Sequence, residues 1–177
     1  MKTLLVLTAA ACVFVAGSAS AQSPTERTGV NSALGVSPST PDFVKEVAIS
    51  DMFEIESSKL AQQKGNPAAK SFADHMIMDH TKTSMELKSL VQGGKVHADL
   101  PAAMDTGHQT KLDKLKSLTG DDFSKNYDQM QRDAHKDAVD LFGRYAKGGD
   151  NADLKQWASS TLPALQTHLK MADDLPK

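Results

Sequence analysis

The chain has 177 residues, of which 40% are hydrophobic, and its formal net charge at pH 7 is −2. Nucleic-acid-binding surfaces carry an excess of Lys and Arg, so this balance argues against a nucleic-acid partner. The sole cysteine, Cys12, excludes a disulfide within the chain. Lipidation of Cys12 is not expected either, because Ala9 stands three positions before it, where a lipobox has leucine.

The first 21 residues have the pattern of a cleavable export signal. Lys2 supplies a positive charge, residues 4–17 are mostly apolar, and residues 19–21 (Ala-Ser-Ala) form a small-residue cleavage motif. The apolar stretch is shorter than the about 20 residues that a membrane-spanning helix needs, and no later segment is apolar enough. We therefore expect a mature chain that starts at Gln22, has no transmembrane segment and resides in the periplasm.

Residues 22–40 are rich in Ser, Thr, Pro and Gly and contain few large apolar side chains. This composition predicts a flexible linker. From position 41 onward the spacing of apolar residues is helical, and the alternation typical of strands is absent. The sequence therefore predicts a signal peptide (1–21), a linker (22–40) and one all-α domain (41–177) large enough for a hydrophobic core.

Capping residues and glycines divide this domain into four long helices and one short helix. The predicted helices cover residues 41–64, 67–92, 104–118, 121–147 and 152–174. Residues 65–67 (Gly-Asn-Pro) end the first helix and start the second, so the two are expected to be antiparallel neighbours. The longer connection 95–103 suits a crossover between two helix pairs, and Pro163 is expected to kink the last helix. This plan is a ferritin-like four-helix bundle with one extra short helix.

Several short motifs lie on these predicted helices. They are Phe43-Val44, Glu54-Ile55, Phe72-Ala73, Asp79-His80, Gln131 with His135, and Leu162-Pro163 followed by Leu165 and His168-Leu169. With these motifs the chain resembles the bacterial exported family called domain of unknown function 4142. The resemblance implies a ferritin-like bundle, export from the cytoplasm and no established activity. Members are often labelled outer-membrane proteins, so an association with the outer membrane stays open.

One inward-facing polar residue on each long helix forms a candidate metal site, which comprises Glu54, His80, His135 and His168. His80 interrupts an apolar stripe at helical spacing, and His168 does the same near the C-terminus. A buried imidazole without a partner costs a few kcal/mol, so these rings need each other, a carboxylate or a metal ion. Three histidines and one carboxylate suit one ion of Zn(II), Cu(II), Ni(II) or Fe(II), and the cofactor stays undetermined at this point.

A di-iron centre is not expected. Di-iron bundles place a Glu three residues before each ligating histidine. In this chain the residues three positions before His80, His135 and His168 are Ile77, Arg132 and Leu165. The bridging carboxylates are missing, which argues against a ferroxidase or a di-iron oxygenase.

Other interpretations of the same residues remain open. In a purely structural or protein-interaction module, the core histidines would hydrogen-bond to Glu54, Asp79, Gln131 or Tyr127. Glu56 is the alternative carboxylate on the first helix.

Methionine offers a further variant. Met76 and Met171 lie within one turn of His80 and His168 and could add thioether ligands for copper. No nucleophile stands beside a base, so we expect a non-catalytic ligand- or metal-binding or stress-accessory protein rather than an enzyme. The sequence identifies no protein partner.

Overall fold

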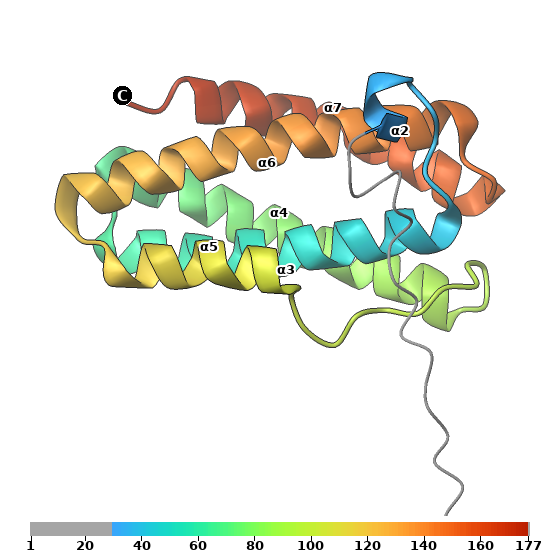
Figure 1. Ribbon diagram of the computed structural model, residues 1–177, viewed down its shortest axis with the longest axis horizontal. Helices are drawn as coiled ribbons and strands as arrows, with labels where there is room; N and C mark the ends of the chain where they lie inside the picture. Colours follow the sequence, from blue (N-terminus) through green and yellow to red (C-terminus); the bar gives the residue numbers. More distant parts are fainter. Residues whose placement is uncertain (1–29, 177) are drawn as a thin grey trace, which may run out of the picture.

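The computed structural model describes residues 30–176, which form an all-α bundle (Figure 1). Within these residues the helices are α2 (Val30–Ala33), α3 (Thr40–Lys64), α4 (Pro67–Gln92), α5 (Thr106–Ser117), α6 (Gly120–Gly148) and α7 (Ala152–Asp173). The predicted all-α bundle is confirmed, and α2 is a second short helix that the sequence did not predict. None of the described helices is long and apolar enough to cross a membrane. The predicted signal peptide, 1–21, lies outside the described residues.

Local capping explains why the helix boundaries agree with the sequence prediction to within two residues. The side chains of Ser39, Asn66, Asp105 and Asn151 each accept a hydrogen bond from the backbone N–H three residues later. Such caps satisfy one of the free N–H groups at a helix N-terminus. These helix starts are therefore determined by short sequence motifs. The last helix, α7, continues through Pro163.

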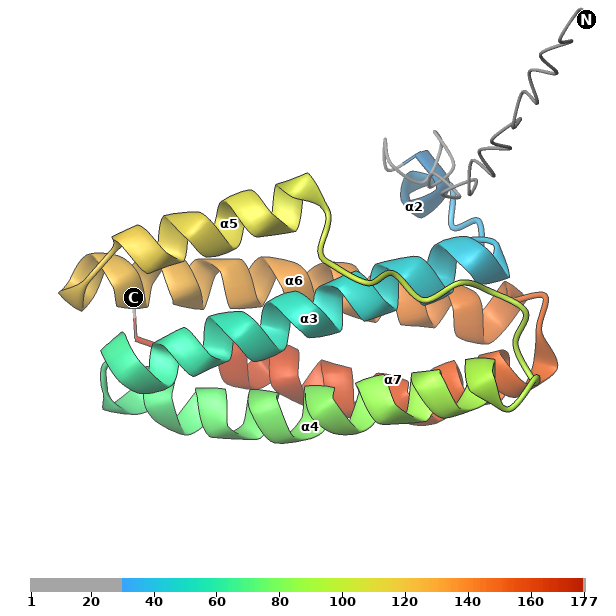
Figure 2. The same ribbon diagram turned by 90° about the horizontal axis from the view of Figure 1, so that it is seen from below.

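The four long helices form two antiparallel pairs, α3 with α4 and α6 with α7 (Figures 1 and 2). Across the bundle, α3 packs against α6 and α4 packs against α7. The segment after α4 runs back along the bundle to α5, which lies against α3 and α6 (Figure 2). This arrangement directs one face of each long helix toward a shared interior.

Part of the predicted linker contacts the bundle. Helix α2 lies next to α6, where Ser32 Oγ donates a hydrogen bond to Asp140 Oδ2 at 2.8 Å. Four residues further along α6, Arg144 donates to the backbone oxygen of Val36 at 2.7 Å. Residues 22–29 of the predicted linker lie outside the described residues. The described part of this segment covers one side of α6.

The interior consists of two apolar clusters with a polar layer between them. One cluster includes Ala61, Phe72, Met76, Phe123, Tyr127 and Ala172. The other includes Phe43, Val47, Leu87, Phe142, Leu154 and Leu165. Each long helix contributes to both clusters, and His80, His135 and His168 lie along their helices between the two contributions. The three histidines therefore occupy a polar layer that is bounded by apolar packing on both sides. Glu54 borders this layer, directly after Phe53 of the first cluster.

Candidate metal centre

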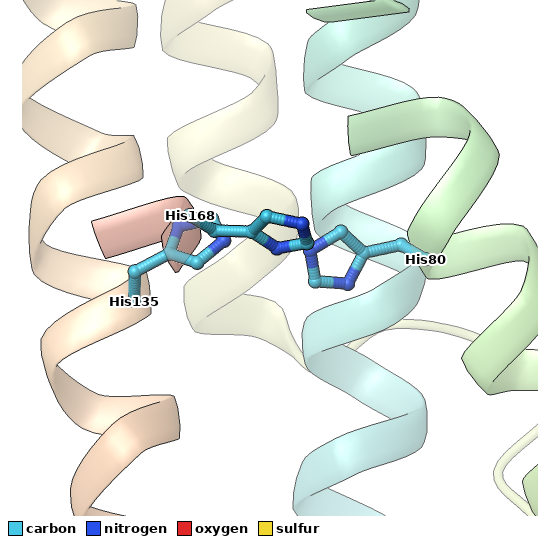
Figure 3. Close-up of side chains that lie close together, drawn as sticks. All are labelled: His80, His135 and His168. Carbon is cyan, nitrogen blue, oxygen red and sulfur yellow. The ribbon is translucent and has the colours of Figure 1, made fainter. Parts of the chain in front are cut away.

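The three predicted histidines meet inside the bundle. His80 from α4, His135 from α6 and His168 from α7 are 4%, 1% and 5% exposed. Each ring offers one nitrogen, and these nitrogens all lie within 4.8 Å of one another. The distances between ring centroids are 5.5, 5.6 and 5.4 Å. Figure 3 shows the rings converging from three different helices. This convergence is the central feature of the site.

The ring of His80 is oriented by Asp51, a buried carboxylate one helix away on α3. Nδ1 of His80 lies 2.8 Å from Asp51 Oδ1. The other oxygen of Asp51 accepts hydrogen bonds from the hydroxyls of Thr83, at 2.8 Å, and Ser84, at 3.0 Å. A carboxylate with these contacts acts as an acceptor, so the proton of the imidazole resides on Nδ1. In the neutral ring the lone pair is then on Nε2.

The other two rings are held in the same manner. Nδ1 of His135 lies 2.8 Å from the backbone oxygen of Gln131, one turn earlier on α6. Nε2 of His168 lies 2.8 Å from Asp79 Oδ2 on α4. A carbonyl oxygen and a carboxylate both accept, so each ring donates through the nitrogen that faces them. The opposite nitrogen of each ring is left as an acceptor.

Those opposite nitrogens have no hydrogen-bond partner. They are Nε2 of His80, Nε2 of His135 and Nδ1 of His168, and all three are buried. A buried acceptor without a partner costs about 1–3 kcal/mol. Metal-binding histidines commonly show this pattern, with one nitrogen hydrogen-bonded to a carboxylate or carbonyl and the other directed at the metal. The geometry therefore fits a shared cation.

Glu54 adds a carboxylate to the same layer. It is 1% exposed, and neither of its carboxylate oxygens has a hydrogen-bond partner. Its Oε1 lies 4.0 Å from Nδ1 of His135, which is too long for a hydrogen bond. Burial raises the pKa of Glu54 to about 7, although a positive charge on His80 acts in the opposite direction. The alternative carboxylate, Glu56, is exposed and pairs with Lys59 at 2.7 Å.

Burial also shifts the pKa values of the histidines. Burial, with a contribution from His80, lowers the pKa of His135 to about 3. The pKa of His168 is lowered by burial as well, which outweighs the opposing hydrogen bond to Asp79. For His80, burial lowers the pKa, but the hydrogen bond and charge of Asp51 outweigh it and the pKa is raised. Two of the three rings are therefore neutral at pH 7, which is the form that binds metal.

Sequence reasoning missed Asp51. It lies three residues before Glu54 and four after Val47, on the inward face of α3, and this spacing was the available signal. Of the predicted hydrogen-bond partners of the histidines, the structure places Asp79 and the backbone of Gln131 against the rings. The hydroxyl of Tyr127 instead lies 2.9 Å from Ser58 Oγ.

The two methionines of the thioether variant are part of apolar packing. Met76 is fully buried in the first apolar cluster, and Met171 packs against that cluster. Methionines commonly fill irregular gaps in cores, and this placement fits that role.

Comparison with known proteins supports the fold and places the chain in a family. A solved structure described as "CopM in the Cu(II)-bound form" is similar, with a TM-score of 0.63 and 18% sequence identity, over 78% of this chain and 95% of that chain. At this identity the similarity supports the helical fold. No match was found among curated proteins. The family model for a domain of unknown function, DUF4142, matches residues 25–175, so the resemblance expected from the motifs is confirmed and the chain belongs to the DUF4142 family.

Proposed function

We propose that this protein binds one transition-metal ion through Nε2 of His80, Nε2 of His135 and Nδ1 of His168, with Cu(II) as the first candidate. The proposal rests on three buried ring nitrogens that lack hydrogen-bond partners, on rings that each offer a nitrogen within 4.8 Å of the others. Nitrogen-rich sites suit Cu(II) and Zn(II). The described Cu(II) form of the similarly folded CopM favours copper.

Glu54 is the acidic partner in this proposal. A divalent ion in a buried layer needs nearby negative charge, because desolvating it would otherwise be costly. The carboxylate of Glu54 is buried beside His135, and its oxygens are not committed to other groups. Its position suits it to balance the charge of the ion, while the ligand atoms that converge within 4.8 Å come from the three histidines. A single carboxylate with three imidazoles makes a mononuclear site, in line with the missing bridging carboxylates of di-iron proteins.

A purely structural polar layer is the second candidate. The hydrogen bonds from the three rings to Asp51, Gln131 and Asp79 favour it, since each ring is anchored without a metal. This candidate leaves three buried nitrogens and the carboxylate of Glu54 without a role. We therefore rank metal binding first.

We infer that the protein binds a metal ion without catalysing a reaction, and that it resides in the periplasm. The first inference rests on three buried imidazoles with unpartnered nitrogens, an arrangement typical of a metal-binding site. The second rests on the export-signal pattern of residues 1–21. Association with the outer membrane and a protein partner remain outside this proposal.

The test is metal analysis of untagged protein purified from the periplasm, followed by titration with Cu(II) and Zn(II). We expect one equivalent bound, a copper electron-paramagnetic spectrum with nitrogen hyperfine structure, and a raised melting temperature, since a ligand that binds the folded state stabilises it. His135→Ala should abolish binding. His75→Ala is the matched control, because His75 is an exposed histidine on the same helix as His80.

Two results would contradict the proposal. One is the absence of metal from the purified protein, together with a melting temperature that neither ion changes. The other is equal loss of binding in His75→Ala and His135→Ala, which would indicate adventitious surface coordination. The first result would favour the structural candidate.

A further inference from the structure

A cavity of about 500 Å³ opens between α3 and α6 and extends inward to the histidine layer. Asp51 and His80 line its inner part, together with Leu165 from α7. Its outer part is bounded by Ser32 and Ala33 of α2 and by His108 and Lys111 of α5. His135 and His168 are not among its lining residues. The cavity therefore reaches the site from the side of His80.

Apolar packing and one hydrogen bond flank the ligand nitrogens on other sides within residues 30–176. The two apolar clusters lie on both sides of the polar layer along the bundle. Between α4 and α7, the hydrogen bond from His168 to Asp79 stands next to the site. Along these directions a hydrated ion would have to cross tight apolar packing or break that bond.

The cavity is suited to a cation in both charge and size. Its lining includes the carboxylates of Glu46, Asp51, Asp137 and Asp140. It also includes the basic residues Lys111 and Arg144, and Arg144 forms an ion pair with Asp140 at 2.8 Å. Acidic residues therefore outnumber basic ones in the lining, and an excess of negative charge in a cleft concentrates cations. With about 30 Å³ for each water molecule, the volume accommodates a divalent ion that still carries its hydration shell.

We propose that this cavity is the route by which a hydrated divalent cation reaches the site, and that His80 is the first histidine to bind it. This inference rests on the proposed metal-binding function. It is carried by the juxtaposition of the cavity with His80, which is 4% exposed and whose Nε2 lacks a partner. The ion then exchanges its remaining water ligands for the nitrogens of His135 and His168, which lie deeper.

The test is to block the cavity and measure the rate of metal loading. In the full chain, Cys12→Ser removes the sole cysteine, so one introduced thiol can be labelled selectively. Ser50→Cys places that thiol in the cavity wall. The matched control is Thr81→Cys, which is exposed, is adjacent to His80 in the chain and does not line the cavity. Each variant is reacted with a bulky maleimide, and Cu(II) uptake is followed by stopped-flow absorbance.

We expect the label at position 50 to slow Cu(II) uptake about tenfold or more, while the final stoichiometry stays at one equivalent. The label at position 81 should change the rate less than about twofold. A small methylthio label at position 50 should have an intermediate effect. Unlabelled Asp137→Asn should reduce the rate of Cu(II) uptake at low salt, because it weakens the electrostatic attraction of the cation into the cavity. The equilibrium affinity for Cu(II) should stay nearly unchanged.

The outcomes separate the two proposals. If the unlabelled protein binds no Cu(II) or Zn(II), both the proposed function and this route are overturned. If it binds one equivalent but the label at position 50 does not slow uptake, or slows it no more than the label at position 81, the route alone is overturned. Slow uptake confined to position 50 supports the route.

Discussion

Asp51 and His80 form a buried hydrogen-bonded pair, with 2.8 Å between Oδ1 of the carboxylate and Nδ1 of the ring. The second oxygen of Asp51 is already committed to the hydroxyls of Thr83 and Ser84. The pair fixes both the position of the ring and the nitrogen that carries its proton. Asp51 is thus a positioning residue for the proposed metal ligand.

This pair makes Asp51→Asn an informative variant. The two hydroxyls need an acceptor, so the amide oxygen will face them and the amide NH₂ will face Nδ1 of His80. The ring must then carry its proton on Nε2, the nitrogen that is required for the metal. We expect the affinity for Cu(II) to fall about 10–100-fold, as is usual when the hydrogen-bond partner of a metal-binding histidine is replaced. Competition titration against a chelator of known affinity measures the change.

Glu56→Gln is the control for this experiment, because Glu56 lies on the same helix but is exposed. The affinity of the Glu56→Gln variant for Cu(II) should match that of the unmodified protein. An unchanged affinity in Asp51→Asn would show that the ring orientation does not depend on this carboxylate.

Glu54→Gln should separate stability from metal binding. Because burial raises the pKa of Glu54 to about 7, the favourable contribution of the protonated acid is present below the unfolded pKa near 4.5 and is lost as the pH rises through 7. At pH 8 the metal-free variant should therefore be more stable by about 1–3 kcal/mol, with little difference at pH 4. Its affinity for Cu(II) should be lower. Urea unfolding at both pH values provides the measurement, and a less stable variant at pH 8 would indicate that the charge supports the metal-free core.

Asp128, seven residues before His135 on α6, predicts a second pH dependence of stability. It is 1% exposed, and its Oδ1 has no hydrogen-bond partner. Burial raises its pKa from 3.8 to about 6, against the charge of Arg132. Its stabilising contribution is thus complete below pH 3.8 and is lost as the pH rises through 6.

Asp128→Asn should consequently stabilise the protein by about 1–2 kcal/mol at pH 7 and by much less near pH 4. The free energy of unfolding at the two pH values tests this expectation. Asp133→Asn, an exposed position on the same helix, controls for the removal of one negative charge and should change stability by less than about 0.5 kcal/mol. Equal effects of the two variants on the free energy of unfolding would show that burial of Asp128 is not what makes its charge destabilising.

Gly143 in α6 and Gly149, the C-cap residue of that helix, should respond to alanine in opposite directions. A Cβ at Gly149 would lie 2.5 Å from the ring of Tyr145, which is fully buried and stacked on Phe43. Gly149→Ala should therefore destabilise the protein by about 1–3 kcal/mol. A Cβ at Gly143 meets no atom within 4 Å, so Gly143→Ala should stabilise the helix by about 0.5–1 kcal/mol. Thermal unfolding distinguishes the two, and destabilisation by both would contradict the packing described for Gly143.

Much of the scaffold was predictable because its signals are local. The run Gly65-Asn66-Pro67 contains a stop, a cap and a favoured first residue, and α4 begins at Pro67 as expected. The inward positions of His80 and His168 followed from helical spacing. The convergence of His80, His135 and His168 agreed with this expectation, although their role as metal ligands stays a prediction.

The parts that were not predictable depend on how the helices are rotated and packed against one another. Asp51 belongs to the site because α3 brings it next to His80 of α4, and a sequence reveals only that Asp51 faces inward. The same limit applies to Ser32 and Asp140, whose hydrogen bond joins the described part of the predicted linker to α6.

Capping and periodicity act over a few neighbouring residues, so the helices, the antiparallel arrangement of α3 and α4 and the four inward polar positions could be predicted from the amino-acid order. Which nitrogen of each imidazole is hydrogen-bonded and which is left without a partner became visible in the packed bundle. So did the cavity that reaches the layer beside His80. These features arise from atoms on different helices, whose relative placement is set by packing across the whole core.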